Sequence, residues 1–237
     1  MSTYAVSDLH GYPVDKFKAL LDRAGFSDED TLFVLGDVID RNGDGGVGLL
    51  RYIISQPKIE LILGNHEEML LECDFLFNEV KVGDLCFSSI NNAMAYLNYL
   101  SNGGRLTIES LRELNKNEPG AVRKILDYLN KAPHIGALTV GGRDFLLVHS
   151  GLGGFDPCRK ISEYKPDDLL WTRPELDTEY FDDIITVFGH TPTYLYGEEH
   201  RGKVLKTRTW IDIDVGAGQG LPPALLRLDD LQVFYGE

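Results

Sequence analysis

The sequence has 237 residues, 43% apolar and 25% charged, which is typical of a globular protein with a sizeable core. It has no apolar run of about 18 residues and no basic or apolar signal segment at its start, so we expect a cytoplasmic protein without a membrane span. The net charge of −14 is the opposite of what non-specific nucleic-acid binding requires, so we expect no nucleic-acid partner. The cysteines, Cys73, Cys86 and Cys158, lack metal-ligand spacing and are interpreted as reduced thiols.

Short apolar runs bounded by turn residues predict buried strands. These runs are Thr3–Val6, Thr31–Leu35, Glu60–Leu63, Phe145–Val148 and Ile184–Phe188. The stretches Val14–Ala24 and Val47–Ser55 carry apolar residues at helical spacing and lie between the first three strands. Strands that alternate with helices indicate an α/β layered fold.

The middle of the chain differs, because its apolar residues recur at helical period from Glu67 to about Lys131. This pattern predicts helices over Met69–Phe77, Ile90–Leu100, Ile108–Leu114 and Val122–Leu129. We interpret residues 1–237 as a single domain with a helical insertion at about 68–131. The last part, Val204–Tyr235, alternates more like antiparallel strands, with a break at Leu221-Pro222-Pro223.

Each predicted strand delivers a polar side chain at its carboxyl end, where ligand crevices form in α/β sheets. The segments that follow the five strands are Ser7-Asp8-Leu9-His10-Gly11, Gly36-Asp37-Val38-Ile39-Asp40-Arg41, Gly64-Asn65-His66-Glu67, His149-Ser150-Gly151 and Gly189-His190-Thr191. One such segment alone would be an ordinary turn. Five with compatible donors favour a common site.

The donor types suit two divalent cations. Asp8, His10 and Asp37 can ligate the first, and the second can be ligated by Asp37, which bridges, together with Asn65, His149 and His190. Mixed carboxylate, imidazole and amide ligation suits Mn²⁺, Fe or Zn²⁺ better than Ca²⁺, and we expect Mn²⁺. Two cations about 3.5–4 Å apart can share a water, lower its pKa and clamp a phosphate.

These five segments together resemble the calcineurin-like metallophosphoesterase superfamily, and most closely the PPP-type serine/threonine protein phosphatases of bacteria and phage. The similarity extends from Asp8 to Ile211-Asp212-Ile213-Asp214. It implies an α/β fold with a four-layer α/β/β/α sandwich of two mixed sheets, a helical insertion, and a dinuclear site at one edge.

The resemblance also implies roles for residues that bind no metal. His66 would be the general acid that protonates the leaving oxygen, oriented by Asp40. Arg41 would bind phosphate oxygens, and Arg173 in Leu170-Trp171-Thr172-Arg173 is similar to the family's second phosphate-binding arginine. The sequence departs from the family at Ser7, where glycine is usual, and after Arg41, where Asn42-Gly43-Asp44-Gly45 replaces a glycine.

We therefore expect a phosphatase that hydrolyses phosphate monoesters by direct attack of a metal-bridging water, with a phosphorylated protein or a small phosphate ester as substrate. The alternative is a symmetrical dinucleoside tetraphosphate hydrolase, which shares these motifs. A phosphodiesterase or nuclease is less favoured because the chain is acidic. An inactive scaffold would be expected to have lost ligands that are all present here.

The basic cluster Arg201, Lys203, Lys206 and Arg208 could contact an anionic substrate, but a solvated hairpin face is the favoured interpretation.

Overall fold

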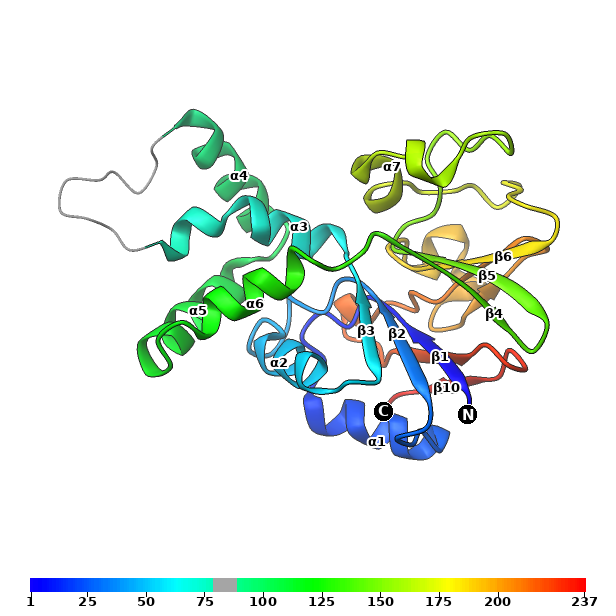
Figure 1. Cartoon of the computed structure of the whole chain (residues 1–237), viewed down its shortest axis with the longest axis horizontal. Coiled ribbons are helices and arrows are strands. Elements are labelled where there is room, and N and C mark those ends of the chain that lie inside the picture. Colours follow the sequence, from blue (N-terminus) through cyan, green and yellow to red (C-terminus); the bar gives the residue numbers. More distant parts are fainter. Residues whose placement is uncertain (79–88) are drawn as a thin grey trace.

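A computed structural model of the chain describes residues 1–78 and 89–237, and its strands form two mixed sheets that face one another (Figure 1). The first sheet has the strand order β10-β9-β1-β2-β3 and the second has the order β4-β5-β6-β8-β7. Both sheets contain parallel and antiparallel neighbours, as expected from the sequence.

The first sheet is built around three parallel strands, β1 (Thr3–Val6), β2 (Thr31–Leu35) and β3 (Ile59–Ile62). Helices α1 (Val14–Ala24) and α2 (Val47–Ser55) make the connections between them. Two late strands complete the sheet, since β9 (Ala224–Arg227) pairs antiparallel with β1, and β10 (Val233–Tyr235) pairs antiparallel with β9.

The second sheet has a parallel centre of β5 (Arg143–Val148), β6 (Ile184–Phe188) and β8 (Trp210–Asp212). Its edges are antiparallel: β4 (Ile135–Val140) pairs with β5, and β7 (Leu205–Lys206) pairs with β8. Strand β4 was not predicted from the sequence. The antiparallel pairing expected for Val204–Tyr235 holds for β7, β9 and β10, but β8 also lies parallel to β6, and the segment divides between the two sheets.

Alternating side chains divide the apolar core into layers. In β1, Ala5 faces the second sheet, while Tyr4 and Val6 face the helices. In β5, Phe145 and Leu147 face the first sheet, while Leu146 and Val148 point to the opposite side. The strands are therefore apolar on both faces, as strands covered on both sides must be.

Helices cover both outer faces, which gives the expected four-layer arrangement. Helices α1 and α2 pack on the first sheet. The outer face of the second sheet is covered by α7 (Pro166–Leu170) and its flanking loops. Short 3₁₀ helices complete the connections: η2 (Ile161–Glu163), η3 (Thr193–Tyr196), η4 (Glu198–His200) and η5 (Ala217–Gln219).

The described residues between β3 and β4 form helices, namely α3 (Asn65–Glu72), η1 (Asp74–Phe77), α4 (Ile90–Ser101), α5 (Arg105–Asn117) and α6 (Ala121–Leu129). Figure 1 shows α4, α5 and α6, which we call the helical segment, projecting to one side of the sheets. Their buried residues continue the core on the helix side of the first sheet, and this packing explains the helical period of the sequence. That the whole chain forms one domain stays a prediction.

Two expectations concern features outside the sheets. Cys73 and Cys158 are free thiols, whereas Cys86 lies outside the described residues. None of the helices in residues 1–78 and 89–237 has the length and apolar content needed to span a bilayer.

Candidate metal centre and active site

The side chains predicted to ligate metal lie together, between the carboxyl ends of strands from both sheets. Each is at most 7% exposed, and the set is Asp8, His10, Asp37, Asn65, His149 and His190. The first four follow β1, β2 and β3, and the two histidines follow β5 and β6. The cluster therefore spans the gap between the two sheets.

The backbone at these loops adopts an uncommon conformation. Of the seven non-glycine residues with positive φ among the described residues, all but Leu231 belong to the predicted site: Asp8, His10, Asp37, Asp40, Arg41 and His190. Such residues cost about 1–3 kcal/mol each and persist only where the surrounding structure holds them. Hydrogen bonds from Asp8 N to Gly36 O (3.1 Å) and from His10 N to Asp37 O (2.9 Å) hold the first two loops together.

Asp37 lies at the centre of the cluster. One of its carboxylate oxygens, Oδ2, is 3.5 Å from His10 Nε2, and the other, Oδ1, is 3.4 Å from His149 Nε2. Two groups of potential ligands share Asp37: one includes His10 and His66, and the other includes His149 and His190. Asp8 joins the first group, with its Oδ1 3.9 Å from His10 Nε2.

The hydrogen bonds of the histidines leave lone pairs that point inward. His10 Nδ1 donates to Ile39 O (3.0 Å) and His149 Nδ1 donates to Leu35 O (2.7 Å), so in each neutral ring Nε2 carries a lone pair. The Nε2 of His149 then faces another acceptor, Asn65 Oδ1, at 2.8 Å. His190 Nε2 is buried and has no partner among the described residues. Converging lone pairs with no proton between them fit bound cations.

The pKa shifts of the buried carboxylates also favour bound cations. Burial, and then the negative charges of Asp8 and Glu67, raise the pKa of Asp37 well above its usual value. Two further buried carboxylates lie near, and burial, followed by their acidic neighbours, also raises the pKa of Asp212 and of Asp214. These two were quoted in the sequence analysis without a role. A buried excess of negative charge is the environment that divalent cations offset.

Glu67, another residue given no role from the sequence, supports the Asp37 loop from the start of α3. Its carboxylate accepts hydrogen bonds from the backbone N–H groups of Asp37 (2.8 Å), Val38 (2.9 Å) and Gly64 (3.2 Å). The side chain is fully buried. It therefore fixes the loop that carries the central ligand.

His66 lies beside the cluster with both ring nitrogens engaged. Its Nδ1 is 2.6 Å from Asp40 Oδ2, and its Nε2 accepts from Arg41 Nη2 at 3.0 Å. Burial, and then the charge of Arg41, lower the pKa of His66, whereas an ionised Asp40 favours the imidazolium form. Burial raises the pKa of Asp40 to about 7, opposed by hydrogen bonds from Thr107 and Tyr99. The sequence analysis named neither of these two donors.

Two arginines at the cluster are exposed to solvent. Arg41 reaches His66, and Arg173 Nη1 donates to His190 O (3.2 Å) and Thr191 Oγ1 (3.3 Å). After Arg41, Asn42 Nδ2 donates to His10 O (3.0 Å), so the unusual loop packs against the first metal-binding loop.

The basic cluster near the second sheet has partners within the chain. Arg201 pairs with Glu198 at 2.7 Å and Arg208 with Asp182 at 2.7 Å. The two lysines donate to backbone carbonyls, those of Glu199 (3.0 Å) and Leu231 (2.7 Å). These contacts agree with the favoured interpretation, a solvated hairpin face.

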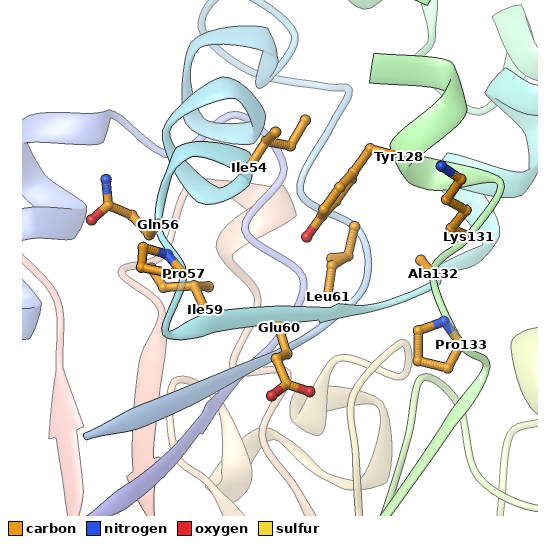
Figure 2. Close-up of a pocket in the computed structure, with 10 residues that line it drawn as sticks. All are labelled: Ile54, Gln56, Pro57, Ile59, Glu60, Leu61, Tyr128, Lys131, Ala132 and Pro133. Atoms are coloured by element: carbon orange, nitrogen blue, oxygen red, sulfur yellow. The ribbon is translucent and has the colours of Figure 1, made fainter. Parts of the chain in front are cut away.

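A separate cavity of about 350 Å³ lies between α2, β3 and α6 (Figure 2). Its lining is largely apolar and includes Ile54, Leu61 and the ring of Tyr128. None of the residues that line it belongs to the predicted site. The chemistry is therefore assigned to the strand-end cluster.

The comparison with known families agrees with this geometry. Residues 1–215 match the calcineurin-like phosphoesterase family, so the chain belongs to that family. The two groups of potential metal ligands that share Asp37 are consistent with that family.

Individual relatives match this chain over a short stretch or at low sequence identity. A symmetrical bis(5'-nucleosyl)-tetraphosphatase of Pseudomonas fluorescens is 40% identical over 86 residues, which cover 35% of this chain and 30% of that relative. The alignment thus spans less than a third of the curated relative. Among solved structures, a candidate diadenosine tetraphosphatase has a TM-score of 0.61 at 18% identity, covering 98% of this chain and 91% of its own. A protein-tyrosine phosphatase of a Shewanella species has a TM-score of 0.55 at 18% identity, covering 100% and 80%. At this identity the structures show a shared fold.

Proposed function

We propose that the chain is a phosphomonoesterase of the phosphoprotein phosphatase type, acting on serine or threonine phosphate esters. The observation that carries the proposal is the pair Arg41 and Arg173, two exposed arginines whose guanidinium groups contact His66 and the backbone of His190 at the buried ligand cluster. Two planar cations can bind the non-bridging oxygens of one terminal phosphate, where charge resides in phosphoryl transfer.

Asp8, His10 and Asp37 would hold one divalent cation, and Asp37, Asn65, His149 and His190 would hold the other, with Mn²⁺ as the favoured metal. When bound, the pair of cations supplies an activated water and neutralises phosphate charge. The neutral rings of His10 and His149 are already in the ligating tautomer, because their Nδ1 protons are donated to backbone carbonyls.

His66 would donate the proton that the leaving oxygen requires. Its Nδ1 bond to Asp40 fixes the plane of the ring and stabilises the protonated form. Nε2 accepts from Arg41 in the neutral ring, so it would carry the transferred proton only once Arg41 turns to a phosphate oxygen, which would leave Nε2 facing the leaving group.

A second candidate is hydrolysis of a symmetrical dinucleoside tetraphosphate. It is favoured by the activity named for the Pseudomonas relative and by Trp171, which is 41% exposed and lies edge-on to His190 with ring centroids 5.9 Å apart. An exposed indole could stack on a base. The monoester proposal is preferred because two arginines suit the oxygens of a single terminal phosphate, and the basic cluster Arg201, Lys203, Lys206 and Arg208 is engaged within the chain.

The test is hydrolysis by metal-stripped protein before and after addition of Mn²⁺. The substrates are p-nitrophenyl phosphate, a phosphoserine peptide and diadenosine tetraphosphate. We expect manganese-dependent release of phosphate from the peptide, with a higher kcat/KM than for the dinucleotide.

A higher kcat/KM for diadenosine tetraphosphate would replace the proposal with the second candidate. No turnover of any substrate with both sites filled, as shown by elemental analysis, would contradict both.

A further inference from the structure

Two hydroxyl groups of the helical segment hydrogen-bond to one side chain of the site, Asp40. Tyr99 in α4 donates to Asp40 Oδ1 at 2.8 Å, and Thr107 in α5 donates to the same oxygen. The other oxygen, Oδ2, binds His66 Nδ1. Asp40, Tyr99 and Thr107 are each 0% exposed. The carboxylate is thus held between two hydroxyl groups on one side and one imidazole on the other.

The corner between α4 and α5 also supports the backbone that carries Asp40. Arg41 N lies 3.4 Å from Gly103 O, and Thr107 Oγ1 also lies 3.0 Å from Gly45 O. A side chain at Gly45 would overlap the backbone of Thr107, so the loop and helix α5 are in close contact. Asp40 and Arg41 have φ values of 75° and 67°, and these contacts help to hold that conformation.

We propose that Tyr99 and Thr107 are positioning residues for the proton donor His66, acting through Asp40, and this inference rests on the proposed function. The helical segment would then be part of the proton-transfer apparatus as well as a covering structure. Asp40 contacts the imidazole, and the two hydroxyl groups decide how the carboxylate is oriented toward it.

The contacts of Asp40 restrict the rotation of its carboxylate. A buried carboxylate with one oxygen anchored by two donors cannot turn about its Cβ–Cγ bond without losing both bonds. Loss of one donor would loosen that anchor and misalign the 2.6 Å bond to His66.

A purely structural role makes a different prediction. If Tyr99 and Thr107 only stabilised the fold, their removal would lower the amount of active protein equally for every substrate. A defect in proton donation instead depends on the leaving group. Phenyl phosphate needs protonation of a basic phenolate more than p-nitrophenyl phosphate does, because the nitro group stabilises the departing anion.

The variants are Thr107→Val, which keeps the shape but removes the hydroxyl, and Thr107→Ser, which keeps the hydroxyl. Tyr99→Phe removes the second donor. Tyr128→Phe is the matched control, because it removes the hydroxyl of another tyrosine in the helical segment, one that lines the separate cavity in Figure 2.

With manganese-loaded full-length protein, we expect Thr107→Val and Tyr99→Phe to lower kcat for phenyl phosphate by about 10- to 100-fold. The loss for p-nitrophenyl phosphate should be clearly smaller, with KM for both substrates little changed. Thr107→Ser and Tyr128→Phe should match the parent. Equal losses on the two substrates, or no loss on either, would overturn the inference.

A second measurement does not depend on catalysis. It therefore tests the positioning role of Tyr99 and Thr107 even if the proposed function is wrong. In the zinc-loaded protein, ¹⁵N-histidine labelling should reveal a low-field Nδ1 proton from the His66–Asp40 bond, assigned by its disappearance in His66→Asn. We expect this signal to shift or broaden in Thr107→Val and Tyr99→Phe and to persist in Thr107→Ser. An unchanged signal in all variants would refute the positioning role.

Discussion

At the scale of single residues, His66 and Asp37 occupy neighbouring places but are proposed to do different work. The ring of His66 is engaged by Asp40 and Arg41, whereas Asp37 directs one oxygen toward His10 and the other toward His149. The first geometry suits proton transfer and the second suits a bridging ligand. Substitutions that keep the shape of each side chain should separate the two roles.

Replacement of His66 by asparagine should lower kcat by about 100- to 10,000-fold, because the proton donor is removed. Metal content should stay at the parental level, since the ring is assigned no cation. Steady-state kinetics and elemental analysis on the same sample check both points. Full activity, or loss of a metal, would contradict the assignment of His66 as the acid.

Replacement of Asp37 by asparagine should instead cost metal. Only the oxygen of the asparagine amide can act as a ligand, because its NH₂ group is a donor. One of the two cations that the carboxylate would bridge therefore loses this ligand. We expect lower metal occupancy by elemental analysis of the dialysed variant, with activity lost in proportion. Retention of both metals at the parental affinity would show that Asp37 does not bridge.

The site residues differ in how far the sequence alone could reveal them. Those that end strands were visible because a short motif marks each, and the structure brings them together. Tyr99 and Thr107 carried no such signal, since they lie 59 and 67 residues from Asp40 in the chain and on helices whose pattern reports only packing. Contacts of this kind depend on how distant elements dock.

At the scale of elements, most strands and helices of the first sheet could be predicted, because β1, β2, α1 and α2 begin and end at the predicted residues. Strand β4 was missed because it lies at a sheet edge and only Val140 in it is buried, so its apolar pattern is weak. The parallel pairing of β8 with β6 was also missed, since the pairing partner of a short strand is set by the packing of the whole sheet.

The contact between α3 and the loop after β2 supplies an element-scale prediction. Glu67→Gln should destabilise the protein by about 1–3 kcal/mol, because an amide NH₂ would replace one oxygen that accepts backbone N–H groups. Urea unfolding checks the value. Glu68→Gln, one residue along the same helix, is the control and should change stability by less than about 0.5 kcal/mol. A similar loss of stability in both variants would contradict a specific role of Glu67 in supporting the loop after β2.

At the scale of the whole molecule, the proposed ligands join two sheets whose facing sides form an apolar layer. Asp8, Asp37 and Asn65 belong to the first sheet, and His149 and His190 belong to the second. Bound cations would therefore connect the two sheets directly and offset the buried negative charge between them.

Metal removal should accordingly lower the stability of the entire fold. Manganese at about 100 times its Kd should add about 2.7 kcal/mol to the free energy of unfolding. Thermal unfolding of the stripped protein, with and without added Mn²⁺, measures the effect. Asp37→Asn serves as the comparison and should show a smaller gain. An unchanged transition temperature in the parental protein would contradict a cation site between the sheets.

The position of β9 and β10 in the first sheet has a consequence for synthesis on the ribosome. These strands come last in the chain but pair onto β1, the strand that comes first. The ligands after β1, β2 and β3 are made early, yet the sheet that carries them stays incomplete until the final residues emerge, and His190 follows most of the chain. Stable metal binding should therefore wait until β9 and β10 have been made, and nascent chains stalled before residue 190 should not retain both cations.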